Sequence, residues 1–167
     1  LPANNTAMDR ARAMGWDTQA KHVTAADIDA FDLSLASPTG KWGRAVYAAT
    51  DDKKLPLLTA AVGKREGVDG LNVMPLMIRQ PSPYDLLENG LPFGQASAEK
   101  MSALGYSGAV EPGAQAVFNP ANIRSRFAAF DPFNRDSSNL LAQSAKFAPA
   151  ATLGALMANE KRKDKRN

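Results

Sequence analysis

Residues 105–125 read GYSGAVEPGAQAVFNPANIRS. It contains two short apolar runs, residues 106–110 and 114–118, which Pro112-Gly113 separates. Short apolar runs bounded by proline and glycine are typical of β-strands joined by a turn. Asn119-Pro120 ends the second run, because proline cannot donate a hydrogen bond to a strand ladder. The stretch therefore predicts two strands connected by a tight turn.

The rest of the chain alternates short strand and helix patterns. Further strands are predicted at residues 19–24, 45–49 and 72–79, and helices at residues 6–14, 55–62 and 97–104. Residues 27–33 alternate apolar and acidic side chains, which fits either a strand or an extended loop with one wet face. Short helices scattered among strands that end at prolines predict an α+β fold and not a doubly wound parallel sheet.

Length and composition exclude several classes of protein. A chain of 167 residues fits one domain that can bury a core without metals or disulfides. No apolar run approaches the roughly 18 residues needed to cross a bilayer, so we expect no membrane partner. The absence of cysteine excludes thiol nucleophiles, disulfides and cysteine-ligated metal sites.

The positive charge is concentrated at the C-terminal end. Residues 160–167 contain five basic and two acidic side chains, and this surplus equals the net charge of +3 for the whole chain. Because the remaining residues carry 15 charges of each sign, we expect no nucleic-acid binding except through this tail. Residues 142–158 are rich in alanine and interrupted by Pro149. We therefore expect one domain over residues 1–141 and a loosely ordered segment over residues 142–167.

The common catalytic motifs are absent from the sequence. It has no glycine-rich phosphate loop, no H-E-x-x-H helix and no G-x-S-x-G turn. His22 is the single histidine, so neither a histidine-rich metal site nor any other metal site is predicted. The chain starts at Leu1 and begins without a signal-like leader, which suggests a piece released from something longer.

Several segments match a known pattern when they are read in chain order. Lys21-His22-Val23-Thr24 lies in the place of a Tyr-His-Gly-Thr strand, and residues 43–52 (G-R-A-V-Y-A-A-T-D-D) are similar to G-x-G-V-Y-F-T-D. Residues 105–110 and 117–125 follow G-Y-D-G and V-F-D-P-x-x-I-R-S. Residues 8–18, 26–34, 72–79 and 126–132 are also similar to segments of this pattern.

Together these segments resemble the ADP-ribosyltransferase domains of phage and prophage polyvalent proteins, over residues 8–141. The resemblance implies an ADP-ribosyltransferase-like split sheet with short helices around an NAD cleft. It assigns His22 and Thr24 to the nicotinamide ribose or amide, and strand alternation points both side chains to one face. It also assigns Tyr47 to stack on nicotinamide. NAD would be the substrate.

The catalytic glutamate of the family is not in register. In the family it begins the closing strand, six residues before the proline, and that position is Ala114 here. A carboxylate near the ribose would stabilise the positive charge that develops as the glycosidic bond breaks. Either Glu111 substitutes from the preceding loop, or Gln115 keeps a hydrogen-bonding role, or the domain is catalytically silent. Val23 also replaces the family glycine.

Two functions therefore remain open, and a third has less support in the sequence. The first is a phage-encoded mono-ADP-ribosyltransferase or NAD glycohydrolase that acts in the virion or the host bacterial cytoplasm and modifies a host macromolecule, such as a protein. The second is a silent transferase fold that serves as a structural or interaction module and contacts other phage proteins. The third is a nuclease-like module, for which His22 alone would have to supply the acid–base chemistry.

Overall fold

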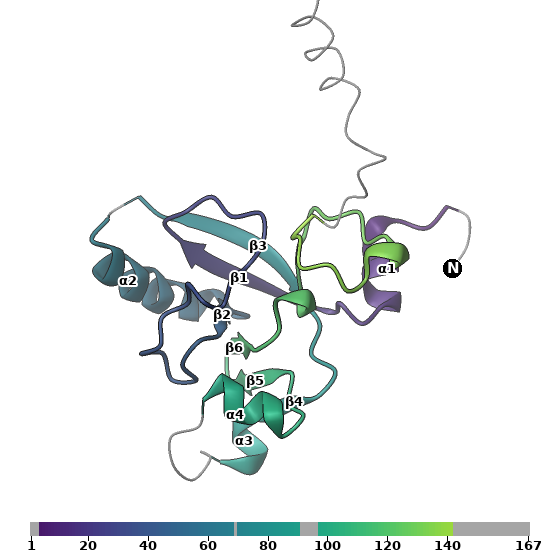
Figure 1. The fold of residues 1–167 in the computed structure, drawn as a ribbon. Helices are drawn as coiled ribbons and strands as arrows, with labels where there is room; N and C mark the ends of the chain where they lie inside the picture. The colour runs from purple at the N-terminus through teal and green to yellow at the C-terminus, as the bar shows by residue number, and fades with distance from the viewer. Residues whose placement is uncertain (1–3, 69, 91–96, 142–167) are drawn as a thin grey trace, which may run out of the picture.

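The strands form one seven-stranded mixed sheet, and the short helices make the protein an α+β fold (Figure 1). The computed structural model describes residues 4–68, 70–90 and 97–141. The strands are β1 (Thr18–Thr24), β2 (Val46–Ala49), β3 (Asn72–Ile78), β4 (Pro83–Asp85), β5 (Gly108–Glu111), β6 (Ala114–Val117) and β7 (Ile123–Ser125). The helices are α1 (Ala7–Ala13), α2 (Leu55–Glu66), α3 (Leu86–Asn89) and α4 (Ala98–Ala103), with 3-10 turns η1 (Asp52–Lys54), η2 (Pro120–Asn122) and η3 (Pro132–Asn134).

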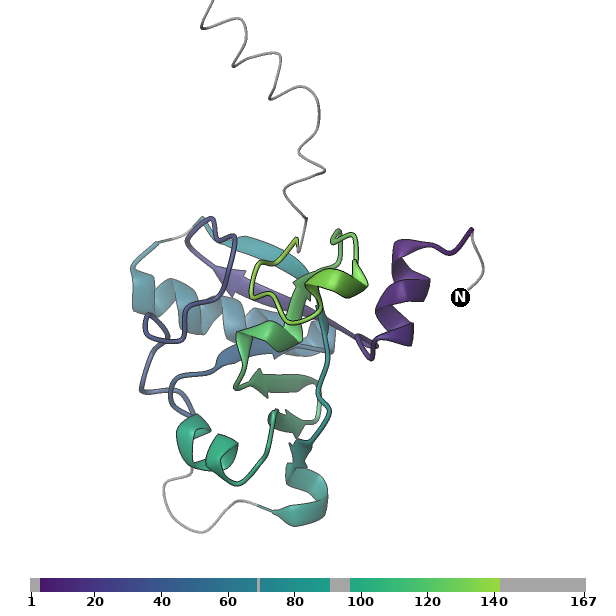
Figure 2. The same cartoon turned by 45° about the vertical axis from the view of Figure 1, so that its right-hand side comes forward.

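The sheet is narrow between β1 and β2. Its strand order is β4-β5-β6-β2-β1-β3-β7, and only the β4–β5 pair is parallel. β1 pairs with β3 along its whole length, from Thr18 opposite Ile78 to Thr24 opposite Asn72. β1 pairs with β2 only where Lys21 lies opposite Ala49. Figure 2 shows the long strands β1 and β3 on one side of this joint and β2, β6, β5 and β4 on the other.

The local signals in the sequence explain where the longer helices begin and end. Thr6 caps α1, and its side chain and that of Asp9 form a reciprocal capping box. The predicted helix over residues 55–62 is confirmed but continues to Glu66. Gly63 lies inside the helix and close to the following chain, since a Cβ there would be 3.3 Å from the Val68 carbonyl oxygen. Gly67, with φ at +68°, ends the helix in the left-handed conformation.

The hairpin predicted from residues 105–125 is confirmed. β5 and β6 pair antiparallel through Pro112-Gly113, and Gly113 has φ at +76°. The Gly113 carbonyl accepts hydrogen bonds from the backbone nitrogens of Thr50 and Asp51, so the turn is tied to the end of β2. Two three-residue strands, β4 and β7, were not predicted, because so short a run has no measurable period.

Residues 27–33 form a loop, which was one of the two alternatives that the sequence left open. A single bridge joins Ala30 to Asn139, and no named strand forms there. This loop supplies Ile28, Phe31 and Leu33 to an apolar cluster that contains Ala20, Val46, Ala48, Leu76 and Val117. We call the side of the sheet that this cluster covers the loop face.

The opposite side, which we call the helix face, carries two further clusters. Ala98 and Met101 of α4 pack with Ala109 and Ala116 of the hairpin, and Tyr47 packs against them. Ala11 of α1 packs with Met77 of β3. Because successive strand residues point to opposite faces, Val46 and Ala48 lie on the loop face while Tyr47 lies on the helix face.

The chain after β7 packs beside α1. Both views show α1 next to the segment that follows β7, at the end of β3 (Figures 1 and 2). Trp16, Ala128 and Phe130 complete the cluster there and are at most 2% exposed. Within the described ranges, no helix has the length and apolar character that crossing a bilayer requires. The expected loose segment at residues 142–167 lies outside the described residues.

Candidate functional site

His22 lies in the middle of β1, at the narrow joint of the sheet. Its Nδ1 donates a hydrogen bond to the Tyr47 carbonyl oxygen of β2, at 2.7 Å, which places the proton on Nδ1. Its ring packs edge-on against Phe31, with the centroids 4.9 Å apart. Burial lowers the pKa of His22, and the bond to the carbonyl offsets part of that effect. The imidazole therefore stays neutral at pH 7 and links the two halves of the sheet.

Thr24 lies on the same face as His22, as the alternation of β1 predicts. Its hydroxyl accepts a hydrogen bond from the Ala26 backbone nitrogen, at 3.1 Å. Thr24 pairs with Asn72 of the neighbouring strand β3. The hydroxyl thus holds the start of the β1–β2 connection.

Tyr47 has its side chain on the helix face, away from His22. Its hydroxyl accepts a hydrogen bond from the Trp42 backbone nitrogen, at 2.8 Å, and donates one to the Gly43 carbonyl oxygen, at 3.1 Å. A Cβ on Gly40 would lie 2.4 Å from that hydroxyl, so the loop closes around it only because residue 40 is glycine. Burial raises the pKa of Tyr47, and the negative charge of Glu111 adds to the increase. The phenol is neutral, and its two hydrogen bonds stabilise the turn at residues 40–43.

Glu111 ends β5 on the same face as Tyr47. Its register follows from Ala109, two residues earlier, which packs in the Tyr47 cluster. Its Oε2 forms an ion pair with Lys41 Nζ at 2.6 Å, and both side chains are partly exposed. The Glu111 carboxylate, which could serve as an acid, is therefore paired with Lys41. This lysine belongs to the turn that the Tyr47 hydroxyl stabilises.

Gln115 is 9% exposed and lies opposite Ala48, on the loop face. Its Oε1 accepts a hydrogen bond from Gln80 Nε2, at 3.1 Å. Gly108 makes room for Gln80, because a Cβ there would lie 2.1 Å from its Oε1. The Gln115 side chain is therefore held on the loop face by its hydrogen bond to the Gln80 side-chain amide.

Ala114 occupies the position at which the resemblance implies the catalytic acid. Ala114 pairs with Ala49 of β2 and with Glu111 of β5, and Ala49 in turn pairs with Lys21. On the helix face, two alanines therefore separate Lys21 from Glu111. Lys21 Nζ is itself paired with Asp52, at 2.6 Å. No carboxylate projects from the Ala114 position.

The expected site residues fall into two groups. His22, Thr24 and Gln115 lie on the loop face, and Tyr47 and Glu111 lie on the helix face. His22 and Tyr47 are joined by the hydrogen bond from the His22 ring to the Tyr47 backbone carbonyl, while their side chains lie on opposite faces. The residues expected to hold NAD therefore do not converge on one cleft, and they do not fit NAD as a bound substrate. In the described part of the chain, no group of three His, Asp or Glu side chains could hold a metal ion.

Comparison of the chain with protein-family models, with curated proteins and with solved structures finds no match.

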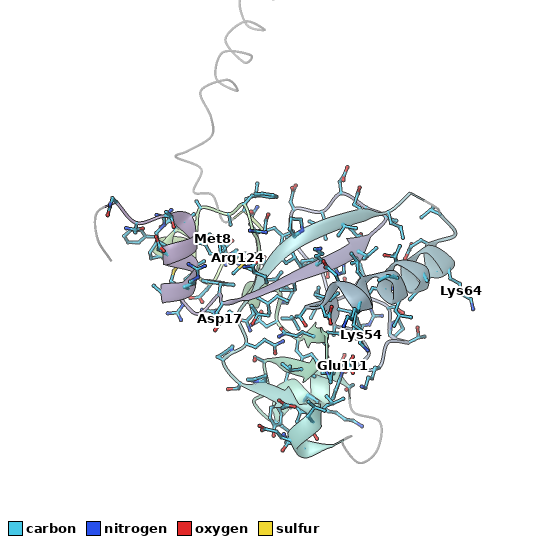
Figure 3. All side chains as sticks on the ribbon, turned by 180° about the vertical axis from the view of Figure 1, so that it is seen from behind. Met8, Asp17, Lys54, Lys64, Glu111 and Arg124 are labelled. Carbon is cyan, nitrogen blue, oxygen red and sulfur yellow. The ribbon has the colours of Figure 1, made fainter. Side chains whose placement is uncertain are left out.

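Sequence reasoning missed a second polar centre, at the end of the molecule beside α1. The guanidinium carbons of Arg79 and Arg124 lie 4.5 and 5.0 Å from the centre of the Trp16 ring. Arg124 is 1% exposed, and burial lowers its pKa to about 10. Figure 3 labels Arg124 near α1 and Glu111 in the other half of the sheet. The sequence signal for Arg124 lies in residues 117–125, which follow V-F-D-P-x-x-I-R-S.

Proposed function

We propose that this chain is an ADP-ribosyltransferase-like domain of the phage polyvalent-protein type that does not turn over NAD and acts as an interaction module. The observation that carries the proposal is the separation of His22 and Tyr47 onto the two faces of the sheet. An NAD cradle needs the two side chains on one ligand, since orientation of the reacting groups supplies much of the catalysis.

The remaining side chains support the same proposal because each has a structural partner. Glu111 is paired with Lys41, and Gln115 is bonded to Gln80. Tyr47 holds the backbone of the turn at Trp42. A catalytic acid or a stacking ring needs a free surface toward its ligand, and these contacts occupy those groups.

The transferase lineage itself is supported by the narrow joint in the sheet. The resemblance implies a split sheet, and β1 and β2 are joined at one residue pair with His22 beside it. Tyr47 lies on the adjoining strand, as the resemblance expects. The halves of such a sheet would remain as a scaffold after the chemistry has been lost.

An active transferase that uses Glu111 is the second candidate. It is favoured by one observation, which is that Glu111 shares a face with Tyr47 and that its charge acts on the phenol. In that case the turn at residues 40–43 would have to open and release Glu111 from Lys41.

The test is release of nicotinamide from labelled NAD by the full chain, alongside a transferase of known activity. We expect no release above the rate in buffer and no thermal shift with NAD. Release that disappears in Glu111→Gln and persists in the control Glu88→Gln would overturn the proposal in favour of the second candidate. Glu88 suits the control because it lies on α3 and is exposed.

A further inference from the structure

The segment at residues 27–36, which we call the strap, lies on the loop face beside His22. It belongs to the connection between β1 and β2. Its side chains Ile28, Phe31 and Leu33 pack against the apolar cluster of the loop face. The Phe31 ring meets the His22 ring edge-on, with the centroids 4.9 Å apart and the ring planes at 89°. The single histidine of the chain is therefore a direct neighbour of the strap.

Most of the polar contacts that hold the strap lie near the surface. Asp27 Oδ1 accepts a hydrogen bond from Asn72 Nδ2, at 3.1 Å, and both residues are exposed. Arg44, which is also exposed, donates to backbone carbonyl oxygens near the end of the strap. The Asp29 carbonyl oxygen accepts a hydrogen bond from the Leu140 backbone nitrogen, at 2.8 Å. Because water competes for exposed hydrogen bonds, the closed strap depends mainly on its apolar side chains.

The joint of the sheet depends on the same histidine ring. β1 pairs with β2 only where Lys21 lies opposite Ala49. At the next residue of β1, the His22 ring donates from Nδ1 to the Tyr47 carbonyl oxygen, at 2.7 Å. Since one ring contacts both the strap and β2, a movement of this ring would loosen the strap and the joint together.

The surroundings of the His22 ring oppose a positive charge on it. Phe31 of the strap and Met74, the partner of His22 on β3, are both apolar. Burial lowers the pKa of His22, and the positive charge of Arg65 on α2 acts in the same direction. Lys21, the preceding residue of β1, points to the helix face and is paired with a carboxylate there. The closed form therefore favours the neutral ring.

The acidic side chains of the strap do not offset this effect. The Asp27 carboxylate is bonded to a side chain of β3, and Asp29 is exposed. Hydrogen bonds from Ser34 hold the pKa of Asp32 below its ordinary value, so this carboxylate stays ionised in mild acid. In the part of the chain that the structure describes, no ion pair joins His22 to a carboxylate. Nothing in the closed strap thus compensates a protonated ring.

We propose that the strap is an acid-responsive cover of the loop face, which opens when His22 takes up a second proton. In an open form, water reaches the whole ring, so the open form binds the proton more readily than the closed form. Acid therefore shifts the population toward the open form. Opening would expose Phe31 and the part of the apolar cluster that the strap covers. The device does not depend on the proposed function, because it uses no contact to NAD.

The test is amide hydrogen exchange, followed by NMR on the full chain between pH 7.5 and 5 and corrected for the intrinsic rate at each pH. The Leu140 amide reports on the strap, to which it donates, and the Phe118 amide reports on the half of the sheet that contains the hairpin. We expect the protection of Leu140 to fall at least about threefold by pH 5 while that of Phe118 is unchanged. In His22→Gln, whose amide can bond to the Tyr47 carbonyl without titrating, the protection of Leu140 should not change with pH.

A second measurement follows the contact itself. Nuclear Overhauser contacts between the ring protons of His22 and Phe31 should be present at pH 7.5 and lost at pH 5. Contacts that persist at pH 5, unchanged protection of Leu140, or an equal fall in the wild type and His22→Gln would each overturn the proposal. A fall that Phe118 shares would also overturn it, because acid would then unfold the whole domain and not the strap. The two wild-type measurements decide the question even where His22→Gln fails to fold.

Discussion

We call the polar centre beside α1, where Arg79 and Arg124 contact Trp16, the corner. At the corner, Arg124 is 1% exposed and donates four hydrogen bonds to backbone carbonyl groups. At the joint between β1 and β2, His22 and Tyr47 each hold a single stretch of backbone, and Glu111 has one partly exposed ion pair. The two regions lie apart, as Figure 3 makes visible for Arg124 and Glu111. Four hydrogen bonds from one buried side chain therefore anchor the chain around β7, and His22 and Glu111 each have one polar partner.

Residues 117–125 contribute to this difference. In residues 117–125, Asn119 caps η2 and Asn122 accepts two hydrogen bonds from Arg79. Ile123 is fully buried, and Arg124 holds the following segment. Each of these side chains therefore has a structural role.

Arg124→Ala should have the largest effect on stability. It removes the donors for four carbonyl groups and leaves a cavity against Trp16, so we expect a loss of about 3–5 kcal/mol in the free energy of unfolding. Urea denaturation measures this loss. The neighbouring exposed Arg126→Ala should stay within about 0.5 kcal/mol. Similar small losses in both variants would remove the contrast between the corner and the joint.

Tyr47→Phe should have a smaller effect. Without the hydroxyl, the backbone nitrogen of the buried Trp42 loses its acceptor, which costs about 1–3 kcal/mol. Tyr84→Phe is the control, because that hydroxyl donates to the carbonyl of the exposed Gly90 and should cost less than about 1 kcal/mol. If Tyr47→Phe left the free energy of unfolding unchanged and abolished NAD binding, the Tyr47 hydroxyl would serve to bind NAD and not to stabilise the turn at residues 40–43.

Acid should weaken the joint through His22. Its pKa in the folded protein is below the ordinary value of 6.5, so its contribution is complete above pH 6.5 and is lost as pH falls from there through the folded pKa. Urea midpoints measured between pH 8 and 5 should decline for the wild type and decline less for His22→Gln. His22 is the single histidine, so parallel profiles would mean that the joint does not depend on its neutral form.

Glu111→Gln should have the smallest effect. Its ion pair with Lys41 is partly exposed, so we expect a loss of about 0–1 kcal/mol that shrinks as salt is added. Unfolding at low and high salt, with Glu88→Gln as the reference, measures it. A large loss that does not depend on salt would indicate a tightly buried role that the ion pair does not explain.

Most of the fold could be predicted from local pattern. The hairpin at β5 and β6 depends on signals within a few residues, and so do the start of α1 after Thr6 and the start of α2 at its proline. The three-residue strands β4 and β7 could not be predicted, because they exist only through pairing with distant strands.

The arrangement of the expected site was less accessible. Alternation correctly placed His22 and Thr24 on one face, because both belong to one strand. The face of Tyr47 depends on the register between β1 and β2, and a shift of one residue would reverse it. The corner at Trp16 joins α1, β3 and the chain after β7, and no pattern within a single segment specifies such a contact.

The most direct test of the account is a nuclear Overhauser measurement on the full chain that compares the ring protons of His22 and Tyr47. The account predicts contacts from the His22 ring to Phe31, and from the Tyr47 ring to the cluster of Trp42, Met101 and Ala116. It predicts none between the two rings, with or without NAD. A direct contact between the His22 and Tyr47 rings would place them in one cleft and contradict the account.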